Sequence, residues 1–369
     1  DLFSVQIVGH PFHILIRLPD HTLVVVAVAE RPQVFAVRKL ILVDQLQALV
    51  VRNVVLLGHG GAGKTTVAEA LALVTGVTKR MGKVVDGNTI SDYDKEEIKR
   101  QFSISTSLIP IEYQGDEGMM KINILDTPGY FDFVGEVEEA VSVADAAIIV
   151  VNCKAGIEVG TEKAWELCDK LKLPRIIFVT NMDDDHASFR ELVLKLERRF
   201  GRCIAPFQLP IRENEKFVGY VNVVKMAGRR FTNLSDYEEC EIPDYSQKNL
   251  GIARDALLEA VAETSEEYME RYFSGEEFTL EEIQGALREH VIDGSIVPVL
   301  MGSGANCQGF KTLLQVIDRY LPTPDKFECI GVDVSTGERF TAKYNDQVSL
   351  SARVFKTIVD PFIGKYSLM

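Results

Sequence analysis

Cysteine is scarce in this chain, and none of its cysteines forms a C-x-x-C pair. That spacing argues against a zinc site and against a disulfide framework, and it predicts free thiols in a reducing, cytoplasmic compartment. The six positions are Cys153, Cys168, Cys203, Cys240, Cys307 and Cys329.

Basic residues are in deficit, because 40 lysines and arginines stand against 54 acidic residues, for a formal net charge of -14. Phosphate backbones are bound by clustered Lys and Arg, so this balance argues against general affinity for nucleic acid, and DNA is not expected as a partner. An RNA partner would have to be met by local patches or by parts outside this sequence.

Long apolar runs are also missing. No uninterrupted run reaches the ~18 residues of a membrane-spanning helix, and the first residues do not have the pattern of a signal peptide. A membrane partner is therefore not expected. The interrupting charges are Arg17, Asp20, Asp44 and Arg52. The remaining composition, 46% hydrophobic and 25% charged, is that of a globular protein long enough for two domains.

The stretch with the clearest chemistry runs from residue 58 to residue 66, and we call it the phosphate loop. It follows an apolar run over 50–57 and opens a helix-patterned run over 67–74, the order of strand, glycine loop and helix that phosphate binding requires. Its glycines let successive N–H groups face a polyphosphate, Lys64 supplies a cation, and the Thr65 hydroxyl can ligate Mg²⁺. Its residues are Gly58, His59, Gly60, Gly61, Ala62, Gly63, Lys64, Thr65 and Thr66.

A second motif follows the apolar run over 119–125, which we predict to pair with 103–113 as a hairpin. Asp126 would end a buried strand and could hold Mg²⁺ through water, and the Gly129 N–H could reach a γ-phosphate. The motif is weak alone and strong after a phosphate loop. Its residues are Asp126, Thr127, Pro128 and Gly129. Between the two motifs, 76–93 predicts a long loop and 94–99 a short charged helical turn.

Helix and strand patterns alternate from residue 135 onward. The strand patterns are continuous apolar runs, as over 146–151, which is typical of a parallel sheet covered by helices on both faces. We therefore predict a doubly wound α/β domain. The predicted helices span 136–144, 159–171 and 187–200, and the predicted strands span 146–152 and 175–180.

Residues 203–294 break that rhythm and predict an inserted α+β subdomain. It would contain a hairpin over 217–231 that turns at Ala227-Gly228, and one long acidic helix over 251–273. Thr279 and Glu282 form a capping box for a further helix that stops near Gly294.

The sheet would resume with a strand over 296–301, followed by a loop over 302–305 and a helix over 309–320. Residues 321–324 have the composition of a linker, and 348–355 the pattern of a strand. We predict a domain at 50–324, an unassigned leader at 1–49 and a second domain over 325–369 that is cut short. The leader carries no motif, and one hypothesis is that it is not native to the domain.

These motifs, in this order, resemble the translational GTPases, and elongation factor G most closely. The resemblance runs from about residue 52 to residue 369, and the segment 355–365 resembles the opening of the family's β-barrel second domain. It implies a P-loop GTPase fold, GTP and Mg²⁺ as ligands, the ribosome as partner, promotion of translocation, and a cytoplasmic monomer. The leader does not resemble the family.

The first departure from the family is Tyr130, where Asp-Thr-Pro-Gly-His carries the histidine that positions the attacking water. A phenol stays protonated at neutral pH and cannot replace an imidazole in that role. Loss of a positioned acid or base slows a reaction by ~10²- to 10⁴-fold, so slow hydrolysis is implied. Alternatively, Tyr130 swings away and another group orients the water. The residues assigned to catalysis are Lys64, Gly129 and Tyr130.

The second departure is Gly61, where the family usually carries an aspartate. Phosphate binding rests on backbone N–H groups and Lys64 and should survive, but a possible ligand for a cation or water is lost. Together with Tyr130, this favours nucleotide binding without efficient turnover. His59 matches the family's phosphate-loop histidine, and we expect its side chain to pack rather than react.

The third departure is the guanine-reading loop, where Thr180, Asn181, Met182 and Asp183 align with Asn-Lys-Met-Asp. The Asp183 carboxylate would accept from guanine N1–H and the 2-amino group, which adenine does not offer, so guanine preference is expected. Weaker affinity is also expected, because Thr180 and Asn181 replace groups that brace the loop and cover the ring. A register shifted by one, ending at Asp184, disturbs the spacing from the strand.

The fourth departure is the first switch, at residues 99–104, where Gln101-Phe102-Ser103 replaces Gly-Ile-Thr. Ser103 keeps a hydroxyl for Mg²⁺, while Gln101 replaces a flexible glycine. The metal ligands implied are Thr65, Ser103 and Asp126. The second base-contacting loop is Ser303, Gly304 and Ala305.

Three other functions stay open at this point. A sister factor, such as release factor three or a tetracycline-resistance ribosome protection protein, shares the architecture. A small-molecule or nucleoside kinase shares the phosphate loop, but it would need an arginine-rich lid, and the helices of 203–294 are acidic. A nucleotide-gated scaffold would bind GTP without ever meeting ribosomes.

Overall fold

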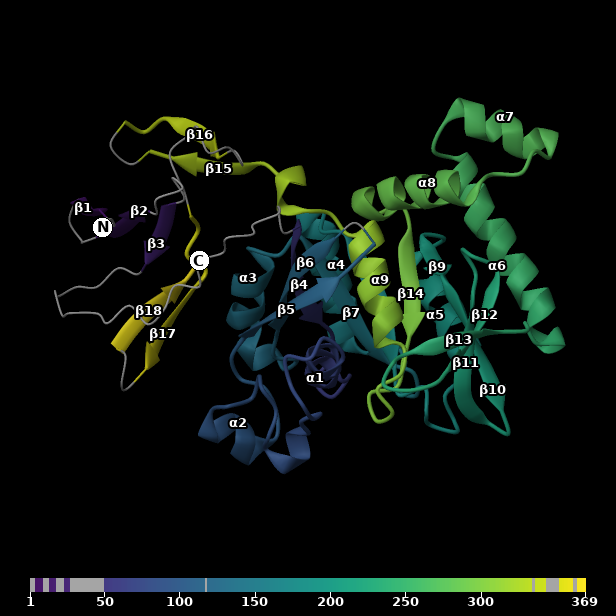
Figure 1. Ribbon diagram of the computed structural model, residues 1–369, viewed down its shortest axis with the longest axis horizontal. Helices are drawn as coiled ribbons and strands as arrows, with labels where there is room; N and C mark the ends of the chain where they lie inside the picture. Colours follow the sequence, from purple (N-terminus) through teal and green to yellow (C-terminus); the bar gives the residue numbers. More distant parts are fainter. Residues whose placement is uncertain are drawn as a thin grey trace. The chain divides into compact units, whose positions relative to one another are not determined.

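The computed structural model describes residues 4–8, 13–17, 23–26, 50–116, 118–333, 336–342, 352–360 and 364–369. The chain divides into two compact units. One unit is Leu49–Pro324, and the other combines Asp1–Ala48 with Asp325–Met369 (Figure 1).

The larger unit is built on a seven-stranded sheet in the order β5-β6-β4-β7-β8-β14-β9. All neighbouring strands are parallel except β5 and β6, which form the predicted antiparallel hairpin. The predicted doubly wound α/β fold is therefore confirmed. The strands are β4 (Val50–Leu57), β5 (Ser107–Gln114), β6 (Met119–Asp126), β7 (Ala146–Asn152), β8 (Arg175–Thr180), β9 (Ile204–Pro206) and β14 (Val297–Met301).

Helices cover both faces of this sheet, which is why the central strands are apolar without alternation. Every residue of β8, and every residue of β7 but the last, is buried. Helices α1 and α9 pack against each other (Figure 1), whereas α3 contacts β4 and α4 contacts β4 and β7. These helices are α1 (Lys64–Val74), α3 (Val134–Val141), α4 (Val159–Leu171), α5 (Phe189–Phe200) and α9 (Phe310–Tyr320).

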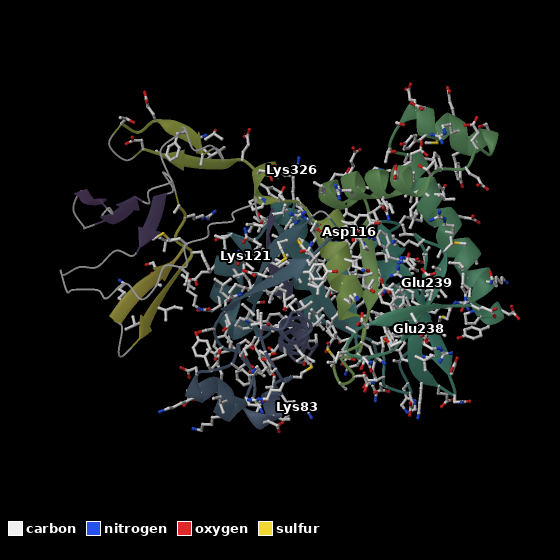
Figure 2. All side chains as sticks on the ribbon, in the orientation of Figure 1. Lys83, Asp116, Lys121, Glu238, Glu239 and Lys326 are labelled. Atoms are coloured by element: carbon white, nitrogen blue, oxygen red, sulfur yellow. The ribbon has the colours of Figure 1, made fainter. Side chains whose placement is uncertain are left out.

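The hairpin of β5 and β6 is tied to the last helix of the unit. Asp116, in the turn between the two strands and labelled in Figure 2, accepts a hydrogen bond from Nε of Arg319 on α9 at 2.9 Å. The shorter elements of the unit are η1 (Val84–Asp86), α2 (Lys95–Arg100) and η2 (Phe131–Phe133), and η3 (Pro324–Lys326) lies at the junction between the two units.

The insertion carries its own four-stranded antiparallel sheet, and two predictions about it are wrong. Ala227 and Gly228 begin a strand rather than form a turn, and the helix predicted over 251–273 is two helices. The break falls where Ser265 accepts from the Tyr268 N–H at 3.1 Å and caps the second helix. The elements are β10 (Gln208–Glu213), β11 (Lys216–Asn222), β12 (Ala227–Phe231), β13 (Tyr237–Cys240), α6 (Asp244–Ala262), α7 (Glu266–Ser274) and α8 (Leu280–Asp293).

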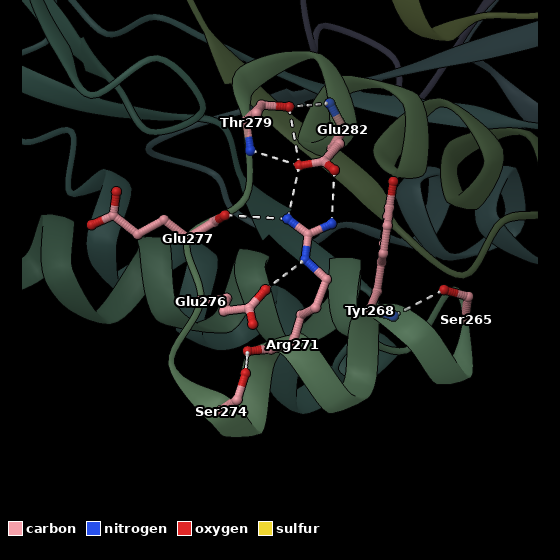
Figure 3. Close-up of polar contacts among 8 residues, drawn as sticks. All are labelled: Ser265, Tyr268, Arg271, Ser274, Glu276, Glu277, Thr279 and Glu282. Carbon is pink, nitrogen blue, oxygen red and sulfur yellow. Dashed lines mark hydrogen bonds and ion pairs between the residues drawn. The ribbon is translucent and has the colours of Figure 1, made fainter.

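Arg271 fastens α7 to the start of α8 (Figure 3). Its guanidinium donates to both carboxylate oxygens of Glu282, at 2.7 and 3.3 Å, and to the Glu277 carbonyl at 3.3 Å. Glu282 also accepts from the Thr279 N–H at 2.8 Å, which confirms the predicted capping box. The arginine, followed by the Thr279 N–H, lowers the pKa of Glu282 to about 2.

The described part of the smaller unit consists of antiparallel β-strands. Three strands of the predicted leader form one sheet, and two hairpins follow the linker. The strand predicted over 348–355 is not confirmed: residues 348–351 lie outside the described residues, and the strand begins at Lys356. The strands are β1 (Ser4–Val8), β2 (His13–Arg17), β3 (Leu23–Val26), β15 (Cys329–Val332), β16 (Arg339–Ala342), β17 (Lys356–Asp360) and β18 (Gly364–Leu368).

The cysteines are thiols wherever the structure describes their side chains, as predicted, and burial raises the pKa of each. They are Cys153, Cys168, Cys203, Cys240 and Cys307. Within the same described residues, no helix combines the length and apolarity needed to cross a bilayer.

A polar network links the N-terminal half of β4 to its neighbours. The Asn53 backbone N–H and Nδ2 donate to the Asp145 carboxylate at 3.0 and 2.9 Å, and Asn123 Nδ2 donates to Asn53 Oδ1 at 2.8 Å. Asp145 is 8% exposed. The network therefore satisfies polar groups that water does not reach freely.

We expect Asp145→Ala to lower the free energy of unfolding by about 1–3 kcal/mol, because both Asn53 donors would lose their acceptor at a partly buried position. Urea denaturation of the two proteins measures the difference. Asp132→Ala, which truncates an exposed carboxylate, is the matched control and should change stability by less than about 0.5 kcal/mol. Equal destabilisation by the two substitutions would contradict the proposed role of the network.

Candidate functional site

The predicted site residues gather at one edge of the seven-stranded sheet. The phosphate loop follows β4, the 126–129 motif ends β6, the guanine-reading loop follows β8, and the 303–304 pair follows β14. These four strands are parallel, so their carboxyl ends meet at the same edge. Ser103 precedes β5, whose antiparallel start pairs with Asp126 and therefore lies there as well.

Glycine is required at several points of the phosphate loop. Gly58 and Gly63 have φ angles of +141° and +99°, and a Cβ on Gly58 would lie 2.4 Å from the Val150 carbonyl oxygen. Gly61 has a φ of +85°, but no atom lies within 4 Å of the position of a Cβ. The missing aspartate would thus face open space, and only the backbone conformation favours glycine there.

Lys64 lies inside the loop, where its ammonium donates to the carbonyl oxygens of Gly58 at 3.0 Å and His59 at 2.9 Å. It is 6% exposed, and burial lowers its pKa to about 8, partly offset by the nearby Asp126 and Asp92 carboxylates. The side chain is therefore held as a cation at the place where a phosphate would sit.

Asp126 is 1% exposed, and neither of its carboxylate oxygens has a hydrogen-bond partner. Burial raises its pKa to about 6 despite the attraction of the Lys64 ammonium. Close by, the hydroxyls of Thr65 and Ser103 lie 3.2 Å apart, so the structure brings the metal ligands implied by the resemblance together.

Asp92 belongs to this site but was missed from the sequence. It is 3% exposed, both of its oxygens lack a partner, and burial raises its pKa. It lies in the long loop 76–93, whose composition carries no motif, and only its burial identifies it. A buried carboxylate without a partner is costly in the absence of a cation.

The donor set fits a hydrated Mg²⁺. Carboxylate and hydroxyl oxygens are the ligands this ion prefers, and it is usually held by one or two carboxylates together with phosphates and water. The described residues contain no group of three or more His, Cys, Asp or Glu that could hold a metal alone. The ion would thus depend on the nucleotide for part of its coordination.

Gly129 and Tyr130 lie directly against the phosphate loop. A Cβ on Gly129 would be 2.5 Å from Lys64 Nζ and 2.6 Å from the Gly60 nitrogen, so no side chain fits. The Tyr130 ring faces Gly60, whose Cβ would be 3.2 Å from the ring carbon Cζ. It also packs on Phe102 of the first switch with ring centroids 4.7 Å apart, and 47% of Tyr130 is exposed.

The His59 side chain is occupied by contacts with the start of α4. Its Nδ1 accepts from the Gly160 N–H at 3.3 Å, and Nε2 lies 3.5 Å from a Glu158 carboxylate oxygen. Its ring meets Phe131 edge-on, with centroids 6.3 Å apart. These contacts hold the loop against its neighbours.

Thr180 connects the guanine-reading loop to the phosphate loop. Its hydroxyl donates to the Ala62 carbonyl at 2.8 Å and lies 3.3 Å from the Val151 carbonyl. Thr180 thus supplies a brace of its own between the two loops, and its effect on affinity stays a prediction. The effect of Asn181, which has a φ of +59°, stays a prediction.

The structure favours Asp183 over Asp184 as the base-reading carboxylate. Asp184 is engaged within its own loop, because it accepts from the His186 N–H at 2.8 Å and pairs with Lys154 at 3.2 Å. Asp183 is exposed beside the buried Met182. Its carboxylate is accessible to a ligand.

The second base-contacting loop is packed on the phosphate loop as well. A Cβ on Gly304 would lie 2.3 Å from Thr66 Cγ2, and the buried Ser303 hydroxyl accepts from the Asn306 N–H at 3.2 Å. The Met182 N–H donates to the Gly302 carbonyl at 3.3 Å, which joins the two base loops. The phosphate loop and the two predicted base loops are therefore in direct contact with one another.

The first switch begins in a strained conformation. Gln101 has a φ of +59°, the left-handed region that glycine adopts more readily. The buried carboxylate of Glu97 then holds the switch by accepting from the Ile104 and Ser105 N–H groups at 2.9 and 3.0 Å. The side chain of Gln101 donates to the Val85 carbonyl at 3.3 Å.

Comparison with known proteins agrees with this geometry. A family model described as the elongation factor Tu GTP binding domain matches residues 49–323, which is most of the chain. The chain belongs to this family. It is a translation-factor-like GTPase domain, for which GTP is the family's ligand and Mg²⁺ the usual ion.

The chain is also similar to a solved structure in sequence and fold. The chain is similar to a protein of Thermus thermophilus whose crystal structure is known, with 35% sequence identity and a TM-score of 0.75. The match covers 86% of this chain and 44% of the Thermus protein. The chain therefore spans less than half the length of that relative.

The raised pKa of Asp126 makes stability depend on pH when metal and nucleotide are absent. The folded pKa of about 6 lies above the ordinary 3.8, so between these values the folded protein binds more protons than the unfolded one. We expect this group to lower the free energy of unfolding by roughly 3 kcal/mol as pH rises from about 4 to about 6. Asp126→Asn should remove that fall.

Urea denaturation across pH 4–7, with chelator present, gives the free energy of unfolding of the wild type and of Asp126→Asn. The difference between the two values at each pH measures the effect. Lys64 does not interfere, because its pKa of about 8 places its titration above this window. Asp132→Asn, at an exposed position, serves as the control. A difference between wild type and Asp126→Asn that stays constant with pH would contradict the assignment.

Proposed function

We propose that this protein is a ribosome-associated GTP-binding translation factor that resembles elongation factor G, promotes translocation and hydrolyses GTP slowly. The observation that supports slow hydrolysis is the position of Tyr130, whose ring lies over Gly60 of the phosphate loop. By the resemblance, Tyr130 stands at the sequence position where the family carries the histidine that positions the attacking water.

Nucleotide binding would rest on the phosphate loop. Its backbone N–H groups would face the phosphates, and Lys64 is already buried and oriented by two loop carbonyls. Thr65, Ser103 and Asp126 would hold Mg²⁺ together with the phosphates, and Asp92 would add a second buried carboxylate. When bound, the ion neutralises charge on the phosphate oxygens.

Guanine selection would rest on Asp183. Its exposed carboxylate can accept from guanine N1–H and the 2-amino group, and adenine offers no such pair of donors. Ser303 and Gly304 pack beside the phosphate loop and would close the base site from the other side. Asn181 would flank the ring.

Catalysis would be weak for two reasons. The Tyr130 ring packs on Phe102 and its phenol would stay protonated at neutral pH, and Gly61 offers no carboxylate to the open space in front of it. Both switches make defined contacts, through the Phe102–Tyr130 packing in one case and the Glu97 hydrogen bonds in the other. We therefore propose that the factor acts mainly through its GTP-bound state and less through rapid hydrolysis. Gly129 retains the close approach that a γ-phosphate contact needs.

We propose the ribosome as a partner because of the family resemblance. The sister factors of elongation factor G remain alternatives for the step of translation in which this protein acts. Release factor three and the ribosome protection proteins share this domain, and the residues that would separate them lie outside it. The family match to residues 49–323 disfavours the kinase. A cytoplasmic monomer stays our prediction.

The test is GTP hydrolysis with and without ribosomes, for the wild type, Tyr130→His and Tyr130→Phe. We expect Tyr130→His to raise the ribosome-dependent rate by roughly 10²-fold or more, because an imidazole can orient the water. Tyr130→Phe keeps the ring that packs on Phe102 and should leave the rate unchanged. Rapid phosphate release by the wild type in a single turnover would refute slow hydrolysis.

Two further outcomes separate the remaining hypotheses. If Tyr130→His does not raise the rate of GTP hydrolysis, the slow rate would be attributed to Gly61. The same assay on Gly61→Asp would then test that attribution. Binding of GTP without any effect of ribosomes would favour the nucleotide-gated scaffold. Binding of ATP as tightly as GTP, measured by calorimetry, would overturn the role of Asp183.

A further inference from the structure

The guanine-reading loop is held by an arginine of the inserted subdomain. Nη2 of Arg212, on β10, donates to the Met182 carbonyl at 2.8 Å and to the Ala187 carbonyl at 3.2 Å. These two carbonyls lie near the two ends of the segment that contains Asp183. One guanidinium thus fixes the backbone on both sides of the base-reading carboxylate.

The backbone around Arg212 is shaped for this contact. The pairing register of β10 and β11 shifts between Ile211 and Arg212, an irregularity that changes the direction of a side chain. Asn214 and Glu215, in the following turn, both have positive φ angles, 48° and 67°. That turn places the Glu215 carbonyl 2.6 Å from Arg212 Nη1, so the guanidinium is fixed from its other side.

The same residue is connected to the first helix of the insertion. The Tyr245 hydroxyl, on α6, accepts from the backbone N–H of Arg212 and donates to its backbone carbonyl, each at 3.1 Å. Arg212 therefore joins two elements of the insertion to the base-reading loop of the GTP-binding domain. Within the loop, the Asp184 carboxylate accepts from the His186 N–H at 2.8 Å, whereas the carbonyls of Met182 and Ala187 accept from Arg212.

We propose that Arg212 is a positioning residue for guanine recognition, which acts by holding the backbone of Met182 and so placing the Asp183 carboxylate against the base. This inference rests on the proposed function, since it requires Asp183 to read the base. It assigns to the insertion a part in nucleotide selectivity. The guanidinium contacts the carbonyls of Met182, Ala187 and Glu215, so its effect should appear in base selectivity rather than in phosphate binding.

The test compares GDP with inosine diphosphate, whose base keeps N1–H but lacks the 2-amino group that Asp183 would accept from. In the wild type, GDP should bind at least about tenfold more tightly, as expected for one hydrogen bond to a charged acceptor. In Arg212→Leu that ratio should fall to within about threefold of one. Equilibrium titration of both nucleotides with the full chain measures it.

Two further variants separate positioning from general damage. Arg230→Leu is the matched control, because Arg230 lies in the same sheet and pairs only with Glu213 among the contacts described. It should keep the wild-type ratio. Asp183→Ala should bring the ratio to about one, and adding Arg212→Leu to it should weaken GDP binding no further, since the two act as one unit.

A wild-type ratio in Arg212→Leu would overturn the inference and leave the proposed function standing. A wild type that binds neither nucleotide would remove the proposed function and the inference together. Should Arg212→Leu not fold, Arg212→Lys replaces it, because a single ammonium cannot reproduce the guanidinium's contacts to all three carbonyls. An intermediate ratio is expected from Arg212→Lys, and an unchanged one would equally overturn the inference.

Discussion

The site depends on one steric constraint: several segments approach the phosphate loop so closely that a Cβ on the glycine at each contact would overlap a neighbouring atom. The Val150 carbonyl fills the space of a Cβ on Gly58, the phosphate loop fills that of Gly129, and Thr66 fills that of Gly304. Each approach brings a different segment of the sheet edge to the loop. Together they place strand β7, the 126–129 motif and the second base-contacting loop against the phosphate loop, and a methyl group on Gly58 or Gly129 would force these backbones apart.

A second constraint is electrostatic. Lys64 is buried, and burial lowers its pKa, while Asp92 and Asp126 are buried carboxylates whose pKa burial raises. Neither carboxylate has a hydrogen-bond partner. These groups are poorly solvated without ligand, so a metal-bound polyphosphate would relieve the energy that the fold has stored in them. The same buried charges that would bind the ligand therefore cost free energy in its absence.

The sequence was enough to predict the doubly wound sheet and the phosphate loop, because both rest on local patterns: continuous apolar strands and glycines at fixed spacing. It was not enough for Asp92, which lies in a loop without periodicity and is identified only by long-range burial. The break at Ser265 was missed because an acidic helical pattern continues across it, and a single N-cap decides the boundary. The register shift at Arg212 depends on pairing with a distant strand. Likewise, the brace from Thr180 could not be inferred from residue type, because a hydroxyl reaches Ala62 only in the folded loop.

The placement of the insertion bears on how the chain folds. Strand β9 has one partner in the sheet, β14, and the insertion separates the two by roughly 90 residues of sequence. This edge cannot close until that long excursion has folded or collapsed, and the pairs β4–β7 and β8–β14 join strands that are about as far apart in sequence or farther. The pairs β5–β6 and β7–β8 are far more local, because Ser107 faces Asp126 and Ala147 faces Arg175. Sheet assembly should therefore begin at these two local pairs, and β9 should join late in the reaction.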